Sequence, residues 1–426
     1  MSDRTVRMTR RQVLKRATGV CASLSAPWFV PASILGRDGA VAPSEKIVLG
    51  GIGIGGRGQH VLGDMIDQPD VRFVAICDVR AERRAAIKNM ADRRYGSTDC
   101  VAYQDFHDLL GRKDIDAVLI ATGDRWHTPL SVQAAKAGKD IYCEKPCSMT
   151  IAESRALADA VRRHGRIYQA GTQRRNVPNF VFAMGLVHGG RLGKLHTVHA
   201  NTLTPTTTSH EWLPAEPEPA KDVVDWDRWL GPCPWRPYNS AYVRGGWRGF
   251  FDFHGGGILE WGSHTVDLCQ WANKADRTAP IEYVPNERGV EARYENGVRL
   301  VMRDQGWLGL GTCSVRFEGD EGWVEAGDSG RIEVHPESLR SERPIVSEEG
   351  TSPRRHARDF LDCVKSRAQP RANAEAACQA HIACHAAYIA CQLGRTLKFD
   401  PTKDAFIGDE EADRMRSRAM REPWRV

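Results

Sequence analysis

The 426-residue chain lacks the features that identify several large classes of protein. It contains no internal repeat and no low-complexity tract, which excludes a solenoid or a long disordered linker. The apolar stretch at residues 17–30 is too short and too polar to span a bilayer, so no stable membrane span is predicted. The twelve cysteines show no paired or metal-ligand spacing, so we expect neither a disulfide framework nor a cysteine-bound metal.

Beyond the N-terminal residues, the chain has no net excess of positive or negative charge. The formal net charge is +5, and residues 1–36 account for all of it, so the remainder balances at zero. A basic face for nucleic acid is therefore not predicted. The composition, 41% hydrophobic and 27% charged, is ordinary for a soluble globular protein, and the length suits two domains preceded by a leader.

The basic N-terminus resembles a twin-arginine export signal. Residues 9–15 read Thr-Arg-Arg-Gln-Val-Leu-Lys, and Pro31 closes the apolar stretch that follows. We therefore expect residues 1–42 to be a signal and linker, the twin-arginine machinery to be a partner, and the protein to be periplasmic or otherwise exported. A basic disordered N-terminus is the alternative, and the cleavage site stays open.

A glycine-rich turn follows the leader. The apolar run 47–52 ends in a glycine cluster before an expected helix, and Gly53, Gly55 and Gly58 fit G-x-G-x-x-G. Such glycines allow a tight turn, close approach to a pyrophosphate and close helix packing. About 20 residues later, the apolar run 71–77 ends in Asp78, where a carboxylate would accept hydrogen bonds from an adenosine ribose. The pattern predicts a dinucleotide, with NAD favoured because Asp78 would repel a 2′-phosphate; Arg80 nearby keeps NADP open.

Strands and helices then alternate as in a parallel, doubly wound sheet. Expected strands at 116–122 and 141–146 are separated by a helix at 128–138 and preceded by one at 80–95. Ligands of such sheets lie beyond the carboxyl ends of the strands. The predicted cofactor-binding residues are Gly53, Gly55, Gly56, Arg57, Gly58, Asp78, Thr122, His127, Glu144, Lys145 and Gln173.

The rhythm changes near residue 171. We expect a helix at 179–190, a strand at 195–203, and an irregular segment at 204–248 that holds five of the twelve tryptophans. Antiparallel strands with turns at residues 296–297 and 318–319 should follow within 291–325, then helices at 354–365 and 372–393. The predicted fold is α/β, with a Rossmann domain at 43–172, a second α/β domain with an open, mostly antiparallel sheet at 173–400, and a polar tail at 401–426.

Two basic side chains are candidates for chemistry at this crevice. Lys145 ends a strand beside the expected nicotinamide position, where its ammonium could stabilise negative charge on a reacting oxygen. A surface pairing of Glu144 with Lys145 is the alternative. A helix beginning near residue 257 would place Glu260 and His264 on one face, and His264 is then a natural proton acceptor. A purely structural histidine is the alternative there.

A metal site is a further alternative at this helix. His254, Glu260, His264 and Asp267 offer imidazole and carboxylate ligands, but their spacing matches no specific zinc signature. We therefore predict no metal.

These motifs together resemble the Gfo/Idh/MocA oxidoreductases, the family of glucose-fructose oxidoreductase and inositol dehydrogenase. The resemblance rests on the glycine fingerprint, Asp78, the tripeptide Glu144-Lys145-Pro146 and the glycine-rich run into His264, and it covers roughly residues 46–424. Residues 229–232, Trp-Leu-Gly-Pro, and 408–412 are similar to an exported, tryptophan-rich branch of that family.

The resemblance implies roles for individual residues. Lys145 would be the catalytic lysine and His264 the general acid/base. Glu260 stands where members often have aspartate, and we expect it to orient substrate hydroxyls or His264. Arg174, Trp247 and Asp267 are predicted to contact substrate.

The function that follows is oxidation of a sugar or cyclitol carbinol by NAD(P), giving a ketone or a lactone. Whether the nucleotide exchanges or stays bound is left open, and the family implies a homodimer or homotetramer. One alternative is an NAD-dependent glycosidase that works by transient oxidation, elimination and re-reduction. Another is a non-catalytic sugar or nucleotide sensor.

Overall fold

The computed structural model describes residues 41–202, 211–304, 309–340 and 354–426. The chain divides into two compact units, residues 1–46 and 47–426, and the described part of the first contains one short 3-10 helix, η1 (Pro43–Glu45). The twin-arginine motif lies outside the described residues. No helix in the described ranges is long and apolar enough to cross a membrane.

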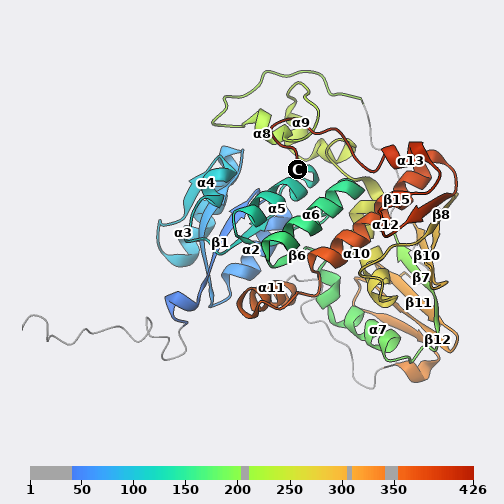
Figure 1. The fold of residues 1–426 in the computed structure, drawn as a ribbon. Helices are drawn as coiled ribbons and strands as arrows, with labels where there is room; N and C mark the ends of the chain where they lie inside the picture. Colours follow the sequence, from blue (N-terminus) through green and yellow to red (C-terminus); the bar gives the residue numbers. More distant parts are fainter. Residues whose placement is uncertain (1–40, 203–210, 305–308, 341–353) are drawn as a thin grey trace, which may run out of the picture. The chain divides into compact units, whose positions relative to one another are not determined.

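The first half of the larger unit is a parallel sheet covered by helices (Figure 1). Within the described ranges its strand order is β3-β2-β1-β4-β5-β6, the doubly wound order expected of a Rossmann domain. The strands are β1 (Ile47–Ile52), β2 (Val71–Cys77), β3 (Val101–Tyr103), β4 (Ala117–Ile120), β5 (Asp140–Cys143) and β6 (Tyr168–Ala170). The helices are α2 (Gly56–Ile66), α3 (Ala81–Tyr95), α4 (Phe106–Leu110), α5 (His127–Lys136) and α6 (Ile151–His164).

Local sequence explains these elements. Every residue of β4 and β5 is buried, as is typical of central parallel strands with helices on both faces. The side chain of Thr150 caps the N-terminus of α6, and Gly165 ends that helix at φ +60°, a conformation that favours glycine. The predicted parallel sheet is therefore confirmed.

The second half contains a larger, mostly antiparallel sheet. In the described residues its order is β13-β12-β11-β7-β10-β9-β8-β14-β15, and only β7 and β10 pair in parallel. The strands are β7 (Leu195–Asn201), β8 (Glu282–Asn286), β9 (Gly289–Arg293), β10 (Arg299–Arg303), β11 (Val315–Gly319), β12 (Gly322–Ala326), β13 (Ile332–His335), β14 (Leu397–Asp400) and β15 (Ala405–Phe406). The predicted α/β fold with a second, mostly antiparallel sheet is confirmed. One turn was misplaced: Gly319 pairs with Gly322, so the chain reverses at residues 320–321.

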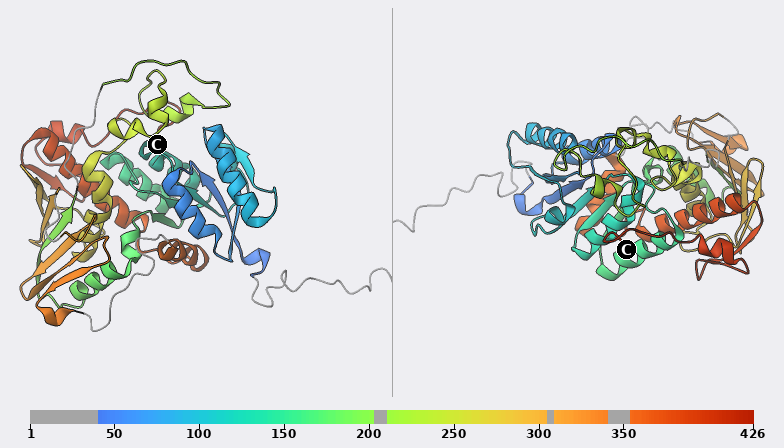
Figure 2. Two further views of the ribbon diagram at one scale, coloured as in Figure 1. Left: turned by 180° about the vertical axis from the view of Figure 1, so that it is seen from behind. Right: turned by 90° about the horizontal axis from the view of Figure 1, so that it is seen from above.

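Two long helices connect the halves. α10 (Gly256–Ala272) packs on β7 and on α12 (Ala374–Leu393), and α12 also contacts β8 and α6. This pair therefore lies between the two sheets, as two views show (Figure 1, Figure 2). Further helices are η2 (Asp124–Trp126), η3 (Gln173–Asn176), α7 (Pro178–His188), η5 (Glu337–Leu339), α11 (Arg354–Ser366) and α13 (Glu410–Arg414).

The segment expected to be irregular has a small core of its own. Its described part carries α8 (Trp226–Leu230), α9 (Ser240–Val243) and η4 (Gly246–Gly249). Trp226 stacks on Trp229 with ring centroids 4.7 Å apart, and Tyr242 and Phe253 complete a buried aromatic cluster. Trp226 and Trp229, two of the five tryptophans of this segment, therefore serve packing.

The C-terminal residues are not a free polar tail. The Trp424 ring lies edge-on to that of Trp126, 5.1 Å away, and Arg421 donates hydrogen bonds to backbone oxygens of Asp227 and Gly231. The chain end is thus tied to the Rossmann half and to α8. The eleven cysteines of the described ranges are free thiols.

Candidate active site

The glycine turn lies between β1 and α2 and leaves room for a ligand. Gly53 has φ +68°, and a Cβ there would meet the Thr122 side chain at 2.1 Å. A Cβ on Gly58 would lie 2.7 Å from the Cβ of Ala121. By contrast, a Cβ on Gly55 or Gly56 would meet nothing within 4 Å. Gly53 and Gly58 are therefore required by the fold, whereas the open space at Gly55 and Gly56 lies at a helix N-terminus suited to an anion.

Asp78 follows β2 at the same edge of the sheet. Its Oδ1 accepts the backbone N–H of Arg80 at 2.9 Å, and burial raises the pKa of Asp78 to about 6. The Arg80 guanidinium donates to the Val243 carbonyl at 2.9 Å and pairs with Glu82. Arg80 is therefore already engaged within the protein.

A cavity of about 800 Å³ joins this turn to the predicted catalytic groups. That volume is within the range of small-molecule and cofactor sites. Of the predicted site residues, the cavity is lined by Gly53, Gly55, Gly56, Arg57, Gly58, Asp78, Thr122, His127, Glu144, Lys145, Gln173, Arg174, Trp247, Glu260 and His264.

Asp267 is the exception among the predicted site residues. It is buried and lies outside the cavity lining, with its Oδ1 and Oδ2 accepting hydrogen bonds of 2.9 and 2.7 Å from Arg175. Asp276 binds the same guanidinium at 2.7 Å. Asp267 is one helical turn from His264 in sequence, but the turn carries it inward to a structural ion pair. We therefore correct its assignment as a substrate residue.

The Glu144 side chain does not pair with the Lys145 side chain at the surface, which was the alternative to a catalytic role for Lys145. The Glu144 carboxylate is buried and accepts Gln173 Nε2–H at 3.1 Å. Arg57 Nε lies 3.7 Å from the same oxygen. A Cβ on Gly171 would lie 2.7 Å from this carboxylate, so glycine there makes room for it.

His127 anchors the chain that follows Lys145. Its Nδ1 lies 2.7 Å from the carbonyl oxygen of Pro146, a distance and partner that place the ring proton on Nδ1. Its Nε2 is buried and has no hydrogen-bond partner among the described residues.

Lys145 points at Glu260. Its Nζ lies 2.7 Å from Oε1 of Glu260 and also donates to the Glu260 backbone oxygen at 3.2 Å. Both side chains line the cavity and are partly buried, so the ammonium and carboxylate fix each other beside the space available to a substrate.

His264 is constrained by Arg174. Arg174 Nη1 donates to His264 Nε2 at 3.0 Å, and Asp328 holds the same guanidinium through contacts of 3.0 and 2.7 Å. Because Nε2 accepts, the neutral ring carries its proton on Nδ1. Burial, and then the charges of Arg174 and Lys145, lower the pKa of His264 well below its ordinary value. His264 is therefore a neutral imidazole at working pH.

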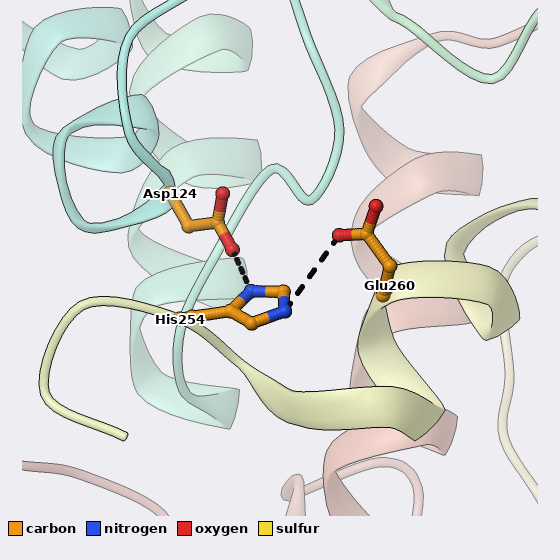
Figure 3. Close-up of side chains that lie close together, drawn as sticks. All are labelled: Asp124, His254 and Glu260. Carbon is orange, nitrogen blue, oxygen red and sulfur yellow. Dashed lines mark hydrogen bonds and ion pairs between the residues drawn. The ribbon is translucent and has the colours of Figure 1, made fainter. Parts of the chain in front are cut away.

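Sequence reasoning missed Asp124 and considered His254 only as a metal ligand. Figure 3 shows the His254 ring between Asp124 and Glu260, with His254 Nδ1 2.7 Å from Asp124 Oδ2 and His254 Nε2 3.8 Å from Glu260 Oε2. In the part of the chain that the structure describes, these three are the group with metal-ligand proximity, and neither His264 nor Asp267 joins them. The signal that could have found Asp124 is its place just beyond the end of β4.

Trp247 is a loop tryptophan that contacts one of these groups. Its ring meets that of His254 edge-on at 5.7 Å, and the Arg248 guanidinium lies 4.4 Å from its centroid. Trp247 lines the cavity, so it is placed to contact a ligand, whereas Trp212 and Trp235 are 53% and 60% exposed.

Two family models match the chain. Gfo/Idh/MocA models described as oxidoreductase family, NAD-binding Rossmann fold, and oxidoreductase family, C-terminal alpha/beta domain, cover residues 47–172 and 184–426.

Curated relatives match part of the chain. The uncharacterised oxidoreductase YrbE of Bacillus subtilis is 34% identical over 172 residues, covering 40% of this chain and 48% of that protein. Inositol 2-dehydrogenase of Salmonella typhimurium is 31% identical over 139 residues, covering 32% and 40%. A glycosyl hydrolase family 109 protein of Saccharopolyspora erythraea is 34% identical over 126 residues, covering 28% of each chain. The chain thus spans less than half the length of these relatives.

Solved structures share the fold over most of the chain. Aldose-aldose oxidoreductase from Caulobacter crescentus, complexed with glycerol, has a TM-score of 0.60 at 19% identity and covers 83% of this chain and 100% of that one. The WlbA dehydrogenase from Bordetella pertussis, in complex with NADH and UDP-GlcNAcA, has a TM-score of 0.60 at 18% identity, covering 83% and 99%.

Proposed function

The chain belongs to the Gfo/Idh/MocA oxidoreductase family, and from this premise we propose that it moves a hydride from a sugar or cyclitol carbinol to NAD. One observation carries the proposal: a single cavity connects the glycine turn and Asp78 to Lys145 and His264. The relatives named as inositol 2-dehydrogenases support a polyol or sugar as the substrate class.

The residues present fit a dinucleotide. The open space at Gly55 and Gly56 suits a pyrophosphate at the N-terminus of α2, and Asp78 suits an adenosine ribose. NAD is favoured over NADP because Asp78 would repel a 2′-phosphate and the Arg80 guanidinium is engaged by Val243 and Glu82. When bound, the nicotinamide supplies the hydride acceptor.

The catalytic roles follow from the cavity wall. His264 binds the reacting hydroxyl and takes part in its acid/base exchange, and Lys145 hydrogen-bonds the same oxygen, stabilises its developing negative charge and can exchange a proton with it. Glu260 holds the Lys145 ammonium in place. Arg174 and Trp247 line the cavity where they can contact the rest of the sugar.

A second candidate uses the same groups for a redox-neutral reaction. Transient oxidation of a sugar hydroxyl acidifies the neighbouring C–H, so a base can remove that proton and a glycosidic substituent can leave before the hydride returns. The observation that favours this NAD-dependent glycosidase is the similarity to proteins named as glycosyl hydrolase family 109.

Location and assembly are proposed from the sequence alone. Residues 1–42 would direct export by the twin-arginine pathway, which moves folded protein and so suits an enzyme that carries its nucleotide with it. We propose that NAD stays tightly bound through successive substrates and that the protein is a homodimer or homotetramer.

The test begins with mass spectrometry of the small molecules released when the purified protein is denatured. NAD recovered in stoichiometric amount, and reduced when myo-inositol, D-glucose or their epimers are added, supports the dehydrogenase. Cleavage of para-nitrophenyl glycosides with no lasting reduction supports the glycosidase. If no nucleotide is recovered and added NAD does not bind, the proposed function is wrong.

Two substitutions test the catalytic assignment. Lys145→Ala and His264→Ala should each lower turnover by about 10²–10⁴-fold, the range for loss of a positioned acid or base. Lys136→Ala, at an exposed position at the end of α5, is the matched control and should leave turnover unchanged. Ligand binding without turnover on the whole panel would instead indicate a sensor.

A further inference from the structure

His254 lies between Asp124 and Glu260, two acidic residues that line the cavity (Figure 3). It is 6% exposed and comes from the chain just before α10, whereas Asp124 comes from η2 (Asp124–Trp126) of the Rossmann half. The groups that face His254 are Asp124, Glu260 and the ring of Trp247. Lys145 lies beyond Glu260.

The hydrogen bond to Asp124 sets the state of this ring. His254 Nδ1 donates to Asp124 Oδ2 at 2.7 Å, so the neutral ring has an unprotonated Nε2. Burial acts to raise the pKa of Asp124, but the hydrogen bond from His254 and the nearby positive charge, including that of Lys145, outweigh it and lower that pKa. Asp124 thus stays ionised and can stabilise an imidazolium, as the carboxylate of a catalytic triad does.

The unprotonated nitrogen faces the catalytic pair. His254 Nε2 lies 3.8 Å from Glu260 Oε2, and the other oxygen of Glu260 lies 2.7 Å from Lys145 Nζ. One bridging water, or a small rotation of the Glu260 carboxylate, is enough to close the 3.8 Å gap. Lys145, Glu260, His254 and Asp124 therefore form a chain of neighbouring groups along the cavity wall, with one gap of 3.8 Å between His254 and Glu260.

The other route for a substrate proton is obstructed. His264 Nε2 already accepts an N–H from Arg174, which Asp328 holds in place. An imidazolium at His264 would place two N–H donors against each other and a positive charge beside Arg174. His264 can hydrogen-bond the reacting oxygen. It is a poor final acceptor for the hydroxyl proton because Arg174 already occupies its Nε2.

We propose that the substrate hydroxyl proton leaves through Lys145 and Glu260 and is stored on His254, which Asp124 holds ready to receive it. The inference rests on the proposed hydride-transfer function. As the hydroxyl O–H bond breaks, its proton passes to Lys145 Nζ while Nζ yields a proton to Glu260 Oε1, and rotation of the protonated carboxyl group then delivers that proton to His254 Nε2. The electron pair of the C–H bond leaves as hydride to NAD, so the products are a ketone, reduced nucleotide and an imidazolium paired with Asp124.

The same three side chains fit a relay better than a metal. The nearest carboxylate oxygens of Asp124 and Glu260 lie at different nitrogens of the His254 ring, which is the arrangement of a hydrogen-bonded chain. The Lys145 ammonium also occupies one oxygen of Glu260. His254 is thus a positioning residue that acts through Glu260 and Lys145.

The test compares His254→Gln and His254→Ala with the wild-type protein. The panel sugar that reduces NAD fastest is used in a stopped-flow experiment that follows reduction at 340 nm and proton release with phenol red. In the wild type, proton release should lag behind reduction because His254 holds the proton. In His254→Gln at neutral pH, the rate of hydride transfer should fall by about 100-fold. Proton release in this variant should no longer lag behind reduction. Added imidazole should restore the rate of His254→Ala.

A control and a second measurement separate the possible failures. His188→Gln changes an exposed histidine bonded to the Trp271 carbonyl and should behave as wild type. Independently of turnover, ¹⁵N-histidine NMR of the wild type at pH 8, assigned by signal loss in His254→Gln, should show a proton on Nδ1 only.

Three results would overturn the relay: a proton on His254 Nε2, a stoichiometric divalent metal lost in Glu260→Gln, or hydride transfer in His254→Gln at the wild-type rate. If no panel sugar reduces NAD in the wild type, the proposed function fails, and the NMR result still decides the state of His254.

Discussion

Gly55→Ala separates cofactor binding from folding. Gly55 precedes α2 with φ −86° and ψ −162°, a conformation that alanine adopts without strain, and an added Cβ meets nothing within 4 Å. Alanine is a poorer residue than glycine before a helix, at about 0.5–1 kcal/mol. It also reduces the entropy of the unfolded chain by a similar amount, about 0.4–1 kcal/mol. The free energy of unfolding should therefore change by less than about 1 kcal/mol.

The affinity for NADH should change far more. If a pyrophosphate approaches the backbone at Gly55, the new methyl group occupies space that the ligand needs. Overpacking of one methyl group costs about 1–3 kcal/mol, and the middle of this range, about 2 kcal/mol, corresponds to roughly thirty-fold in Kd.

Two other glycines near the turn serve as controls. Gly63 is inside α2, where a Cβ would meet only the Met90 side chain at 4.0 Å. Gly63→Ala should stabilise the protein by about 0.5–1 kcal/mol without affecting NADH. Gly58→Ala places its Cβ 2.7 Å from that of Ala121 and should destabilise the protein by about 1–3 kcal/mol.

The assay pairs NADH fluorescence titration with urea unfolding for all three variants. A thirty-fold loss of affinity in Gly55→Ala with an unchanged unfolding midpoint supports the reasoning. It is refuted if Gly55→Ala binds NADH as tightly as Gly63→Ala does, since the turn would then not approach the cofactor. A lowered midpoint in Gly55→Ala would instead show that the site is needed for folding.

Two further predictions concern buried charges. Asp267→Asn removes one of the two carboxylates that pair with Arg175 and should lower the free energy of unfolding by about 3 kcal/mol. An unchanged urea midpoint would contradict the ion-pair assignment. Burial lowers the histidine pKa to about 4, about 4 and about 3 at His356, His381 and His385. The unfolded chain binds protons below about pH 6.5 and the folded chain does not, so stability is lost as pH falls, by about 2 kcal/mol per histidine at pH 5. His385→Gln should lose less stability than the wild type between pH 7 and pH 5 in urea unfolding, and equal losses would refute the prediction.

The parallel sheet could be predicted because its signals are local. The glycine turn, the apolar strands and Asp78 lie within about 30 residues of one another, the length of one βαβ unit. The second sheet was also predicted as mostly antiparallel, although its order could not be, because β7 pairs with β10 and β11 across about 100 residues. The misplaced turn after β11 differs by two residues, which local turn propensity does not resolve.

The sequence by itself determined the fold class, the glycine turn with Asp78, and the candidates Lys145 and His264, because motif spacing and periodicity act over short stretches of chain. Only the tertiary structure decided which side chains meet. It turned Asp267 inward to Arg175, bound Arg174 to His264, and placed His254 between Asp124 and Glu260. These partners are as much as 130 residues apart, as for His254 and Asp124, so long-range packing rather than local pattern brings them together.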